Sequence, residues 1–130
     1  MKTTTVSRGY KCGVKIQDEC VIQTEEEWKA LFQQAYPERN FEDHGAGYDF
    51  SAQTLIAVFQ GESHERSAIK IEGVKEKGDV LEVLVSHNNG QASKDTWSPY
   101  HIVRVPKTEK PVEFNYQGKS DLTVSDYKKA

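Results

Sequence analysis

An unbroken apolar run, LIAVF at residues 55–59, is the feature of the sequence that most constrains its fold. Successive side chains of a strand point to opposite faces, so consecutive apolar residues predict a strand that is covered on both faces. Gln60 and Gly61 end the run. The chain has 130 residues, the usual length of one domain, so we expect this strand to lie at the centre of a single core.

Other segments have the two-residue period of strands. Residues 69–74 and 81–85 flank a Lys-Gly-Asp turn and predict a hairpin. Residues 100–105 stop at Pro106, and residues 112–116 predict the last strand. The second half of the chain is therefore expected to be rich in strands.

One helix is predicted near the start of the chain. Thr24 and Glu27 have the spacing of a capping box, and the acidic residues 25–27 suit the positive end of a helix. Apolar residues follow at positions 28, 31, 32 and 35, which places them on one helical face. The helix is expected to end at Tyr36, because Pro37 disfavours helical backbone in the residue before it.

These patterns predict an α+β fold, with one main helix packed on a largely antiparallel, strand-rich sheet of about six or seven strands. A single domain is expected over residues 1–116, followed by a polar tail over residues 117–130. Residues 38–54, 61–67 and 86–97 are expected to be loops. The predicted core comprises Trp28, Leu31, Phe32, Leu55, Ala57, Phe59, Ile69, Ile71, Leu81, Val83, Ile102 and Val103.

Two cysteines, Cys12 and Cys20, lie in a stretch that has the pattern of an opening hairpin over residues 10–22. A hairpin could bring them together, and the sequence leaves two alternatives open: a disulfide between them or two inert thiols. A disulfide would place the protein outside the reducing cytoplasm, in the periplasm, at the cell surface or in the medium. In that case, because no signal peptide follows Met1, the chain is expected to begin at or near a mature terminus.

Charge and hydropathy limit the classes of partner. The formal net charge is -3, which gives no general attraction to nucleic acid. No stretch approaches the roughly 20 apolar residues of a membrane span. We therefore expect no nucleic-acid partner and no membrane span in this chain, and the sequence leaves the oligomeric state open.

No arrangement of residues has the spacing of a catalytic, cofactor or metal site. The four histidines lie far apart and lack the spacing of a zinc motif. At residues 63–65 a serine, a histidine and a glutamate are adjacent, but neighbouring side chains of an extended chain point in opposite directions. Gly45 and Gly47 lack the third glycine and the preceding strand of a nucleotide motif. We predict a protein that is not an enzyme and that uses no cofactor and no metal.

The order of several short motifs resembles the C-terminal domain family of PrcB, a bacterial subunit associated with a protease complex. The likeness covers residues 20–115, and its motifs are Val21-Ile22, Glu27-Trp28, Tyr48-Asp49-Phe50, Phe59-Gln60-Gly61-Glu62 and Ser98-Pro99-Tyr100-His101-Ile102-Val103. The resemblance implies a sheet-rich, non-enzymatic domain of extracytoplasmic bacterial proteins, often lipoproteins. Where the family carries a Thr-Gly-Gly-Tyr loop, this chain has Glu65-Arg66-Ser67-Ala68, so inhibition of a protease through that loop is not implied.

Binding of another protein outside the cytoplasm, in association with a protease complex or to stabilise one, is the leading functional hypothesis. Loops on a rigid sheet often carry recognition, so we expect the partner at residues 61–67 and 86–97. The predicted partner-binding residues are His64, Glu65, Arg66, Trp97 and Tyr100. The alternative is a pocket protein that binds a small ligand through the aromatic residues of the 36–50 loop.

Overall fold

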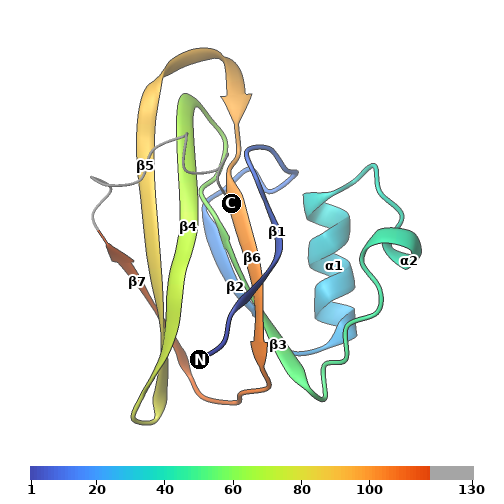
Figure 1. Cartoon of the computed structure of the whole chain (residues 1–130). Helices are drawn as coiled ribbons and strands as arrows, with labels where there is room; N and C mark the ends of the chain where they lie inside the picture. Colours follow the sequence, from blue (N-terminus) through green and yellow to red (C-terminus); the bar gives the residue numbers. More distant parts are fainter. Residues whose placement is uncertain (118–130) are drawn as a thin grey trace.

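The computed structural model describes residues 1–117, which form two β-sheets and a helical layer (Figure 1). The first sheet has the order β1-β6-β3-β2, with the bounds Thr4–Gly9, Tyr100–Pro106, Gln53–Phe59 and Asp18–Ile22. The second sheet has the order β4-β5-β7, with the bounds Ser63–Lys77, Val80–Trp97 and Val112–Gln117. The helices are α1 (Glu25–Ala35) and α2 (Phe41–His44). The polar tail predicted for residues 117–130 lies outside the described residues except for Gln117, which ends β7.

Strand β3 lies inside the first sheet, where it pairs antiparallel with β2 and with β6. Leu55, Ala57 and Phe59 pack on the side of the helices, whereas Ile56 and Val58 pack against the second sheet. None of these five side chains is exposed to solvent. The prediction that the apolar run is a strand covered on both faces is therefore confirmed.

Helix α1 covers one face of the first sheet (Figure 1). The N–H of Glu27 donates a hydrogen bond to Oγ1 of Thr24 at 3.1 Å, and the N–H of Thr24 donates one to the Glu27 carboxylate at 3.0 Å. This confirms the capping box, and the predicted apolar face at positions 28, 31, 32 and 35 is buried. Neither helix of the described residues has the length and apolar character to cross a membrane.

Helix α2 is a single turn that no pattern in the sequence predicts. The side chain of Asn40 caps it by accepting a hydrogen bond from the N–H of Asp43 at 3.2 Å. Only Phe41 of this helix is buried. The turn escapes prediction because four residues are too few to show a helical period.

The second sheet covers the opposite face of the first. Strands β4 and β5 form a long antiparallel hairpin through a turn at Gly78, as predicted, and β7 adds to β5 in parallel. Residues of both strands pack against Ile56 and Val58 of β3. Every residue of the predicted core is buried, but the core is divided between the two faces of the first sheet.

The predicted fold class is wrong. Residues 1–117 are mostly β, in two sheets, and the one helix of substantial length is a minor layer. Strands β4, β5 and β7 form a second sheet and do not extend the first. The period of side chains along a strand identifies the strand but not the element that covers it. The continuous apolar pattern of β3 therefore fits a face covered by a second sheet as well as a face covered by helices.

Residues 61–67 and 86–97 are not loops for most of their length. Strand β4 begins at Ser63 and β5 continues to Trp97, so the two segments pair with each other. We call residues 63–67 and 89–97 the hairpin arm. These segments are polar and lack an apolar two-residue period, which is why their sequence predicts loops.

The predicted opening hairpin is also wrong, because β1 and β2 lie at opposite edges of the first sheet with β6 and β3 between them. Cys12 and Cys20 are both free thiols. The Cys12 thiol donates to the carbonyl of Ser98 at 3.5 Å, and the Cys20 thiol donates to the carboxylate of Asp18 at 3.8 Å. Of the two alternatives, the structure therefore shows two separate thiols and no disulfide between Cys12 and Cys20. The prediction of an extracytoplasmic location loses the support that a disulfide would give it.

Candidate functional site

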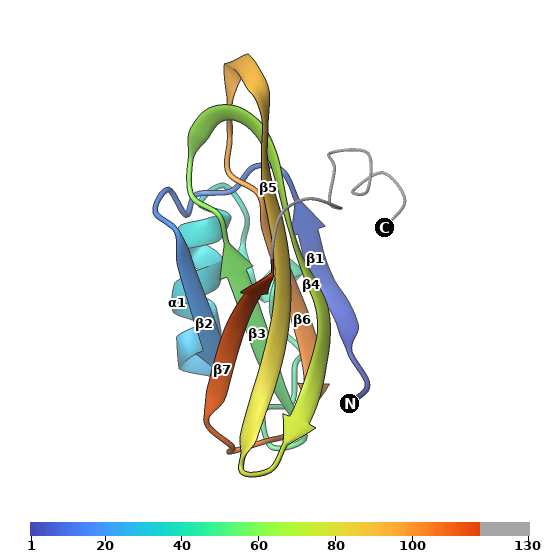
Figure 2. The ribbon, with the colours of Figure 1, turned by 90° about the vertical axis from the view of Figure 1, so that its left-hand side faces the viewer.

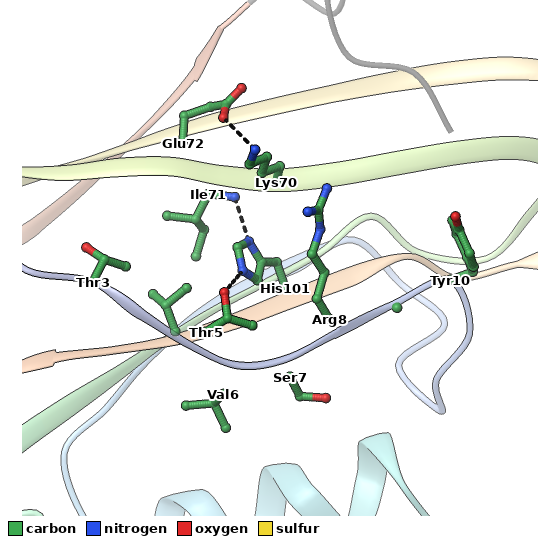
Figure 3. Close-up of a pocket in the computed structure, with 12 residues that line it drawn as sticks. Thr3, Thr5, Val6, Ser7, Arg8, Tyr10, Lys70, Ile71, Glu72 and His101 are labelled. Atoms are coloured by element: carbon green, nitrogen blue, oxygen red, sulfur yellow. Dashed lines mark hydrogen bonds and ion pairs between the residues drawn. The ribbon is translucent and has the colours of Figure 1, made fainter. Parts of the chain in front are cut away.

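A cavity of about 650 Å³ opens between strands β1 and β4 (Figure 3). It is lined by Thr3 and residues 5–10 of the β1 region and by residues 70–72 of β4. His101 and Val103 of β6 complete the lining. We call this cavity the edge groove.

Each of the two bordering strands has an edge that pairs with no other strand of the described residues. Strand β1 pairs only with β6, at the end of the first sheet, and β4 pairs only with β5, at the end of the second. Figure 2 shows β1 and β4 next to each other on one side of the molecule. Because an unpaired edge presents backbone N–H and C=O groups, it can accept a further strand.

The opposite side of the two sheets is linked by a side-chain contact. There, the hydroxyl of Tyr116 on β7 donates a hydrogen bond to the carboxylate of Glu19 on β2 at 2.6 Å. Among residues 1–117, the sheet edges on this side are thus joined, whereas those on the other side border a cavity.

Both bordering strands are irregular at the groove. The register of β1 against β6 shifts between Thr5 and Ser7, and the register of β4 against β5 shifts between Ile71 and Gly73. Such bulges bend a strand, redirect its side chains, and are frequent at sheet edges and beside functional sites. Two strand irregularities therefore lie among the residues that line this cavity.

The imidazole of His101 links the two sheets beneath the groove (Figure 3). Its Nδ1 accepts a hydrogen bond from the N–H of Ile71 at 2.9 Å, so a neutral ring carries its proton on Nε2 and donates it to Oγ1 of Thr5, also at 2.9 Å. Burial, and then the positive charges of Arg8 and Lys70, lower the pKa of His101 to about 3. The ring is therefore neutral at physiological pH, and both of its nitrogens are engaged.

Two cations and one carboxylate border the groove. Arg8 extends from β1 and Lys70 from β4 on the same side of His101 (Figure 3). Nζ of Lys70 lies 3.5 Å from the carboxylate of Glu72, and both side chains are 38% exposed. A partly exposed pair of this kind contributes only about 0–1 kcal/mol, so Lys70 can exchange its partner at little cost.

Four of the five predicted partner-binding residues lie beside one end of the groove, on the hairpin arm. His64, Glu65 and Arg66 are exposed on β4. The Arg66 guanidinium lies 5.3 Å from the ring of Trp97, which is half-buried at the end of β5. Tyr10, which lines the edge groove, packs edge-on against Trp97 at 5.2 Å between ring centroids. The structure thus brings Arg66 and Trp97 together, as an intramolecular cation–π contact.

Tyr100 is not part of this surface. Its side chain is 6% exposed and packs on the helical side of the first sheet, with its ring edge-on to Tyr36. Its hydroxyl lies 3.3 Å from Oγ of Ser7. The prediction that Tyr100 contacts a partner is wrong, because the alternation along β6 turns it into the core.

The aromatic residues of the 36–50 segment pack in or against the core: Tyr36 and Phe41 are buried, and Tyr48 and Phe50 are partly buried. Phe41 packs edge-on against Phe32 at 5.5 Å between ring centroids, and Tyr48 packs against Trp28 at 6.1 Å. Phe41 is 5% exposed. Phe41 and Tyr48 therefore do not provide the open apolar pocket that the small-ligand alternative requires.

The groove residues Arg8, Lys70 and His101 were not among the predicted site residues. Arg8 and Lys70 come from segments more than sixty positions apart, and nothing local marks either of them. His101 does carry a signal, because it is a polar residue inside an apolar strand, between Tyr100 and Ile102. A buried histidine in such a place must find hydrogen-bond partners, so it marks a contact with another element.

The thiols and acidic side chains offer little chemistry. No group of three or more His, Cys, Asp or Glu side chains within residues 1–117 is arranged to hold a metal ion. Burial raises the pKa of the Cys12 thiol, and burial together with the Asp18 carboxylate raises that of Cys20 to about 11. Both thiols are therefore protonated near neutral pH, the form that is a poor nucleophile and a poor metal ligand.

Comparisons of the chain with family models, with curated proteins and with solved structures find no match. Kinship with the C-terminal domain family of PrcB stays a prediction from the short motifs.

Proposed function

We propose that the chain is a non-catalytic protein-binding module whose edge groove takes up an extended segment of a partner protein as an added strand. The observation that carries the proposal is the meeting of two unpaired strand edges, those of β1 and β4, at one cavity. In strand addition, backbone hydrogen bonds provide affinity and side-chain contacts provide selectivity. The groove offers both a backbone edge and polar side chains.

Strand β1 is the edge that receives the segment. On β4, the N–H of Ile71 is already donated to His101. The lining instead follows β1 along its length, from Thr3 to Tyr10, so an added strand has several residues to pair with. The partner segment would extend the four-stranded first sheet beyond β1, and residues 70–72 of β4 would form the facing wall.

The side chains around the groove support binding more than catalysis. His101 is the histidine of the lining, and its two nitrogens are engaged by Thr5 and Ile71. A general base needs an available nitrogen and a pKa near the working pH, and His101 has neither. The hydroxyls of Thr5 and Ser7 are therefore not placed beside an imidazole that could activate them.

The partner remains a prediction of the family resemblance: a protease complex outside the cytoplasm. Strand addition does not require that partner, because backbone pairing is independent of the identity of the protein that supplies the strand. The hairpin arm, with Arg66 and Trp97, is the second candidate contact surface, since arginine and tryptophan often anchor partners.

The test uses peptides selected against the full chain from random nonapeptides displayed on phage. A selected peptide is resynthesised with a single backbone N-methyl group at each position in turn. We expect methylation to abolish binding at every second position, because alternate N–H groups of a strand face the strand that it pairs with. In an NMR titration, the backbone signals of residues 3–10 and 70–72 are expected to shift.

Arg66→Ala serves as the matched control, since Arg66 is exposed on β4 but does not line the groove. It is expected to leave the affinity unchanged. Loss of affinity in this variant, with shifts confined to the arm, would place the site at Arg66 and Trp97. Sensitivity to methylation without a period of two would exclude strand addition.

A further inference from the structure

We propose that the segment bound in the edge groove is acidic and that one of its carboxylates is held between Arg8 and Lys70. This inference rests on the proposed function and names the class of partner. Its structural basis is a pair of cations that come from different sheets and border one cavity.

The two cations approach the groove from opposite walls. Arg8 belongs to the receiving strand β1 and Lys70 to the facing strand β4, and both lie close enough to the buried ring of His101 for their charges to lower its pKa. A strand added to β1 runs between these walls. A side chain that it projects toward β4 therefore enters a space bordered by both cations.

The sign of the charge differs between the groove and the whole protein. The chain carries a formal net charge of -3, yet the lining of the groove holds two cations and one carboxylate, Glu72. Glu72 is paired with Lys70, and that pair is partly exposed and weak. A carboxylate of the partner can therefore replace Glu72 as the ion-pair partner of Lys70, or share Lys70 with it. The net negative charge of the chain repels an acidic segment elsewhere on the surface, so the two cations favour its binding at the groove.

Arginine suits the proposed contact because its planar guanidinium matches the geometry of a carboxylate. Two cations are too few to follow the phosphates of a nucleic acid on a chain of net negative charge. The geometry and the charges together point to an extended peptide segment that carries aspartate or glutamate.

The experiment repeats the selection of random nonapeptides on the full chain and on a variant with both Arg8→Gln and Lys70→Gln. We expect aspartate or glutamate to be enriched at one position on the wild type and not on the variant. In a selected peptide, replacing that acid by its amide is expected to weaken binding to the wild type about fivefold. The same replacement is expected to have no effect on binding to the variant.

Single variants locate the contact. Lys70→Gln is expected to weaken binding of the acidic peptide, and Glu72→Gln to strengthen it about twofold, because it releases Lys70. Lys75→Gln is the matched control: it removes an exposed lysine of the same strand that does not line the groove, and its affinity should match the wild type. Should Arg8→Gln reduce folding, as judged by thermal denaturation, the two variants at Lys70 and Glu72 decide the question alone.

Each contrary result has a separate meaning. Selected peptides that show the two-residue methylation period without acidic enrichment overturn this inference and leave strand addition standing. Loss of the methylation period overturns both. Analytical sedimentation tests whether the carboxylate comes from a second copy of the chain. A wild-type dimer that dissociates in the Lys70→Gln variant would show this and would overturn the proposal of a separate partner.

A variant that lacks residues 118–130 should bind the acidic peptide with unchanged affinity. Tighter binding by this variant would mean that the chain's own terminus competes for the groove, and it would overturn the proposal.

Discussion

The Nδ1 atom of His101 on β6 lies 2.9 Å from the backbone nitrogen of Ile71 on β4, so a side chain of the first sheet satisfies an edge amide of the second. The contact lies at the bulge of β4 and directly beneath the edge groove. Within residues 1–117 the two sheets share no backbone ladder, so this hydrogen bond is a side-chain link between them. His101 is thus a structural support for the groove.

Replacing His101 with alanine is expected to lower the free energy of unfolding by about 3 kcal/mol, since the buried N–H of Ile71 loses its acceptor and a cavity remains. Urea denaturation measures the change. His64→Ala, at an exposed histidine, is expected to stay within about 0.5 kcal/mol of the wild type. Equal effects of the two substitutions would contradict the supporting role of His101.

Acid is expected to destabilise the protein through His101. In the unfolded chain this histidine titrates near its ordinary pKa of about 6.5, whereas in the folded protein its pKa is about 3. Between these values the unfolded state binds more protons than the folded state. The contribution of neutral His101 to the free energy of unfolding is therefore fully present above about pH 6.5 and is lost as the pH falls. At pH 5 the loss is about 2 kcal/mol.

Urea denaturation at pH 7.5 and at pH 5 tests this pH dependence. His101→Gln keeps an acceptor for Ile71 without a titrating ring, so its stability is expected to fall about 2 kcal/mol less than that of the wild type. His44→Gln, at an exposed position, is the control and should retain the full acid loss. The same acid loss in all three proteins would assign it to other groups.

Thr24→Ala is expected to lower the free energy of unfolding by about 1 kcal/mol, because the first turn of α1 loses the hydroxyl that accepts from the N–H of Glu27. Thr24→Ser keeps the capping hydroxyl and should change the stability little. Denaturation in urea distinguishes the two. An alanine variant as stable as the serine variant would show that the cap contributes nothing here.

Gly90→Ala is expected to disrupt the hairpin arm, because a Cβ atom at this position would lie 2.0 Å from the carbonyl oxygen of Arg66. Amide hydrogen exchange of residues 63–67 and 89–97 should accelerate, since the paired backbones must separate. Gly73→Ala is the control on β4, where a Cβ atom meets nothing within 4 Å. Slow exchange that persists in Gly90→Ala would indicate that the arm tolerates the methyl group and is not paired closely here.

Local features of the fold were predictable where they depend on short-range physics. The cap of α1 follows from the chemistry of Thr24 and Glu27, and the turn at Gly78 follows from a residue that accepts positive φ without strain. The buried state of Leu55 and Ile56 follows from the unbroken apolar run at residues 55–59. Each of these inferences needs only neighbours within a few residues.

The candidate site was not predictable in the same way. The sequence directed attention to Arg66 and Trp97, which do lie together, and to Tyr100, which is buried. It did not mark Arg8 or Lys70. A groove between two sheet edges depends on which strands stay unpaired on one side, and that is a property of sheet order.

The sequence by itself therefore determined the central strand β3, the hairpin at Gly78, the strands β6 and β7, the main helix and many of the core residues, because side-chain period and capping act over a few residues. Tertiary structure alone decided that β4, β5 and β7 form a second sheet and that β1 and β4 end at a common groove. The physical reason is that backbone hydrogen bonds are the same for every residue type. Pairing between distant strands is thus selected by how the whole set of apolar faces is buried, and no local pattern records that choice.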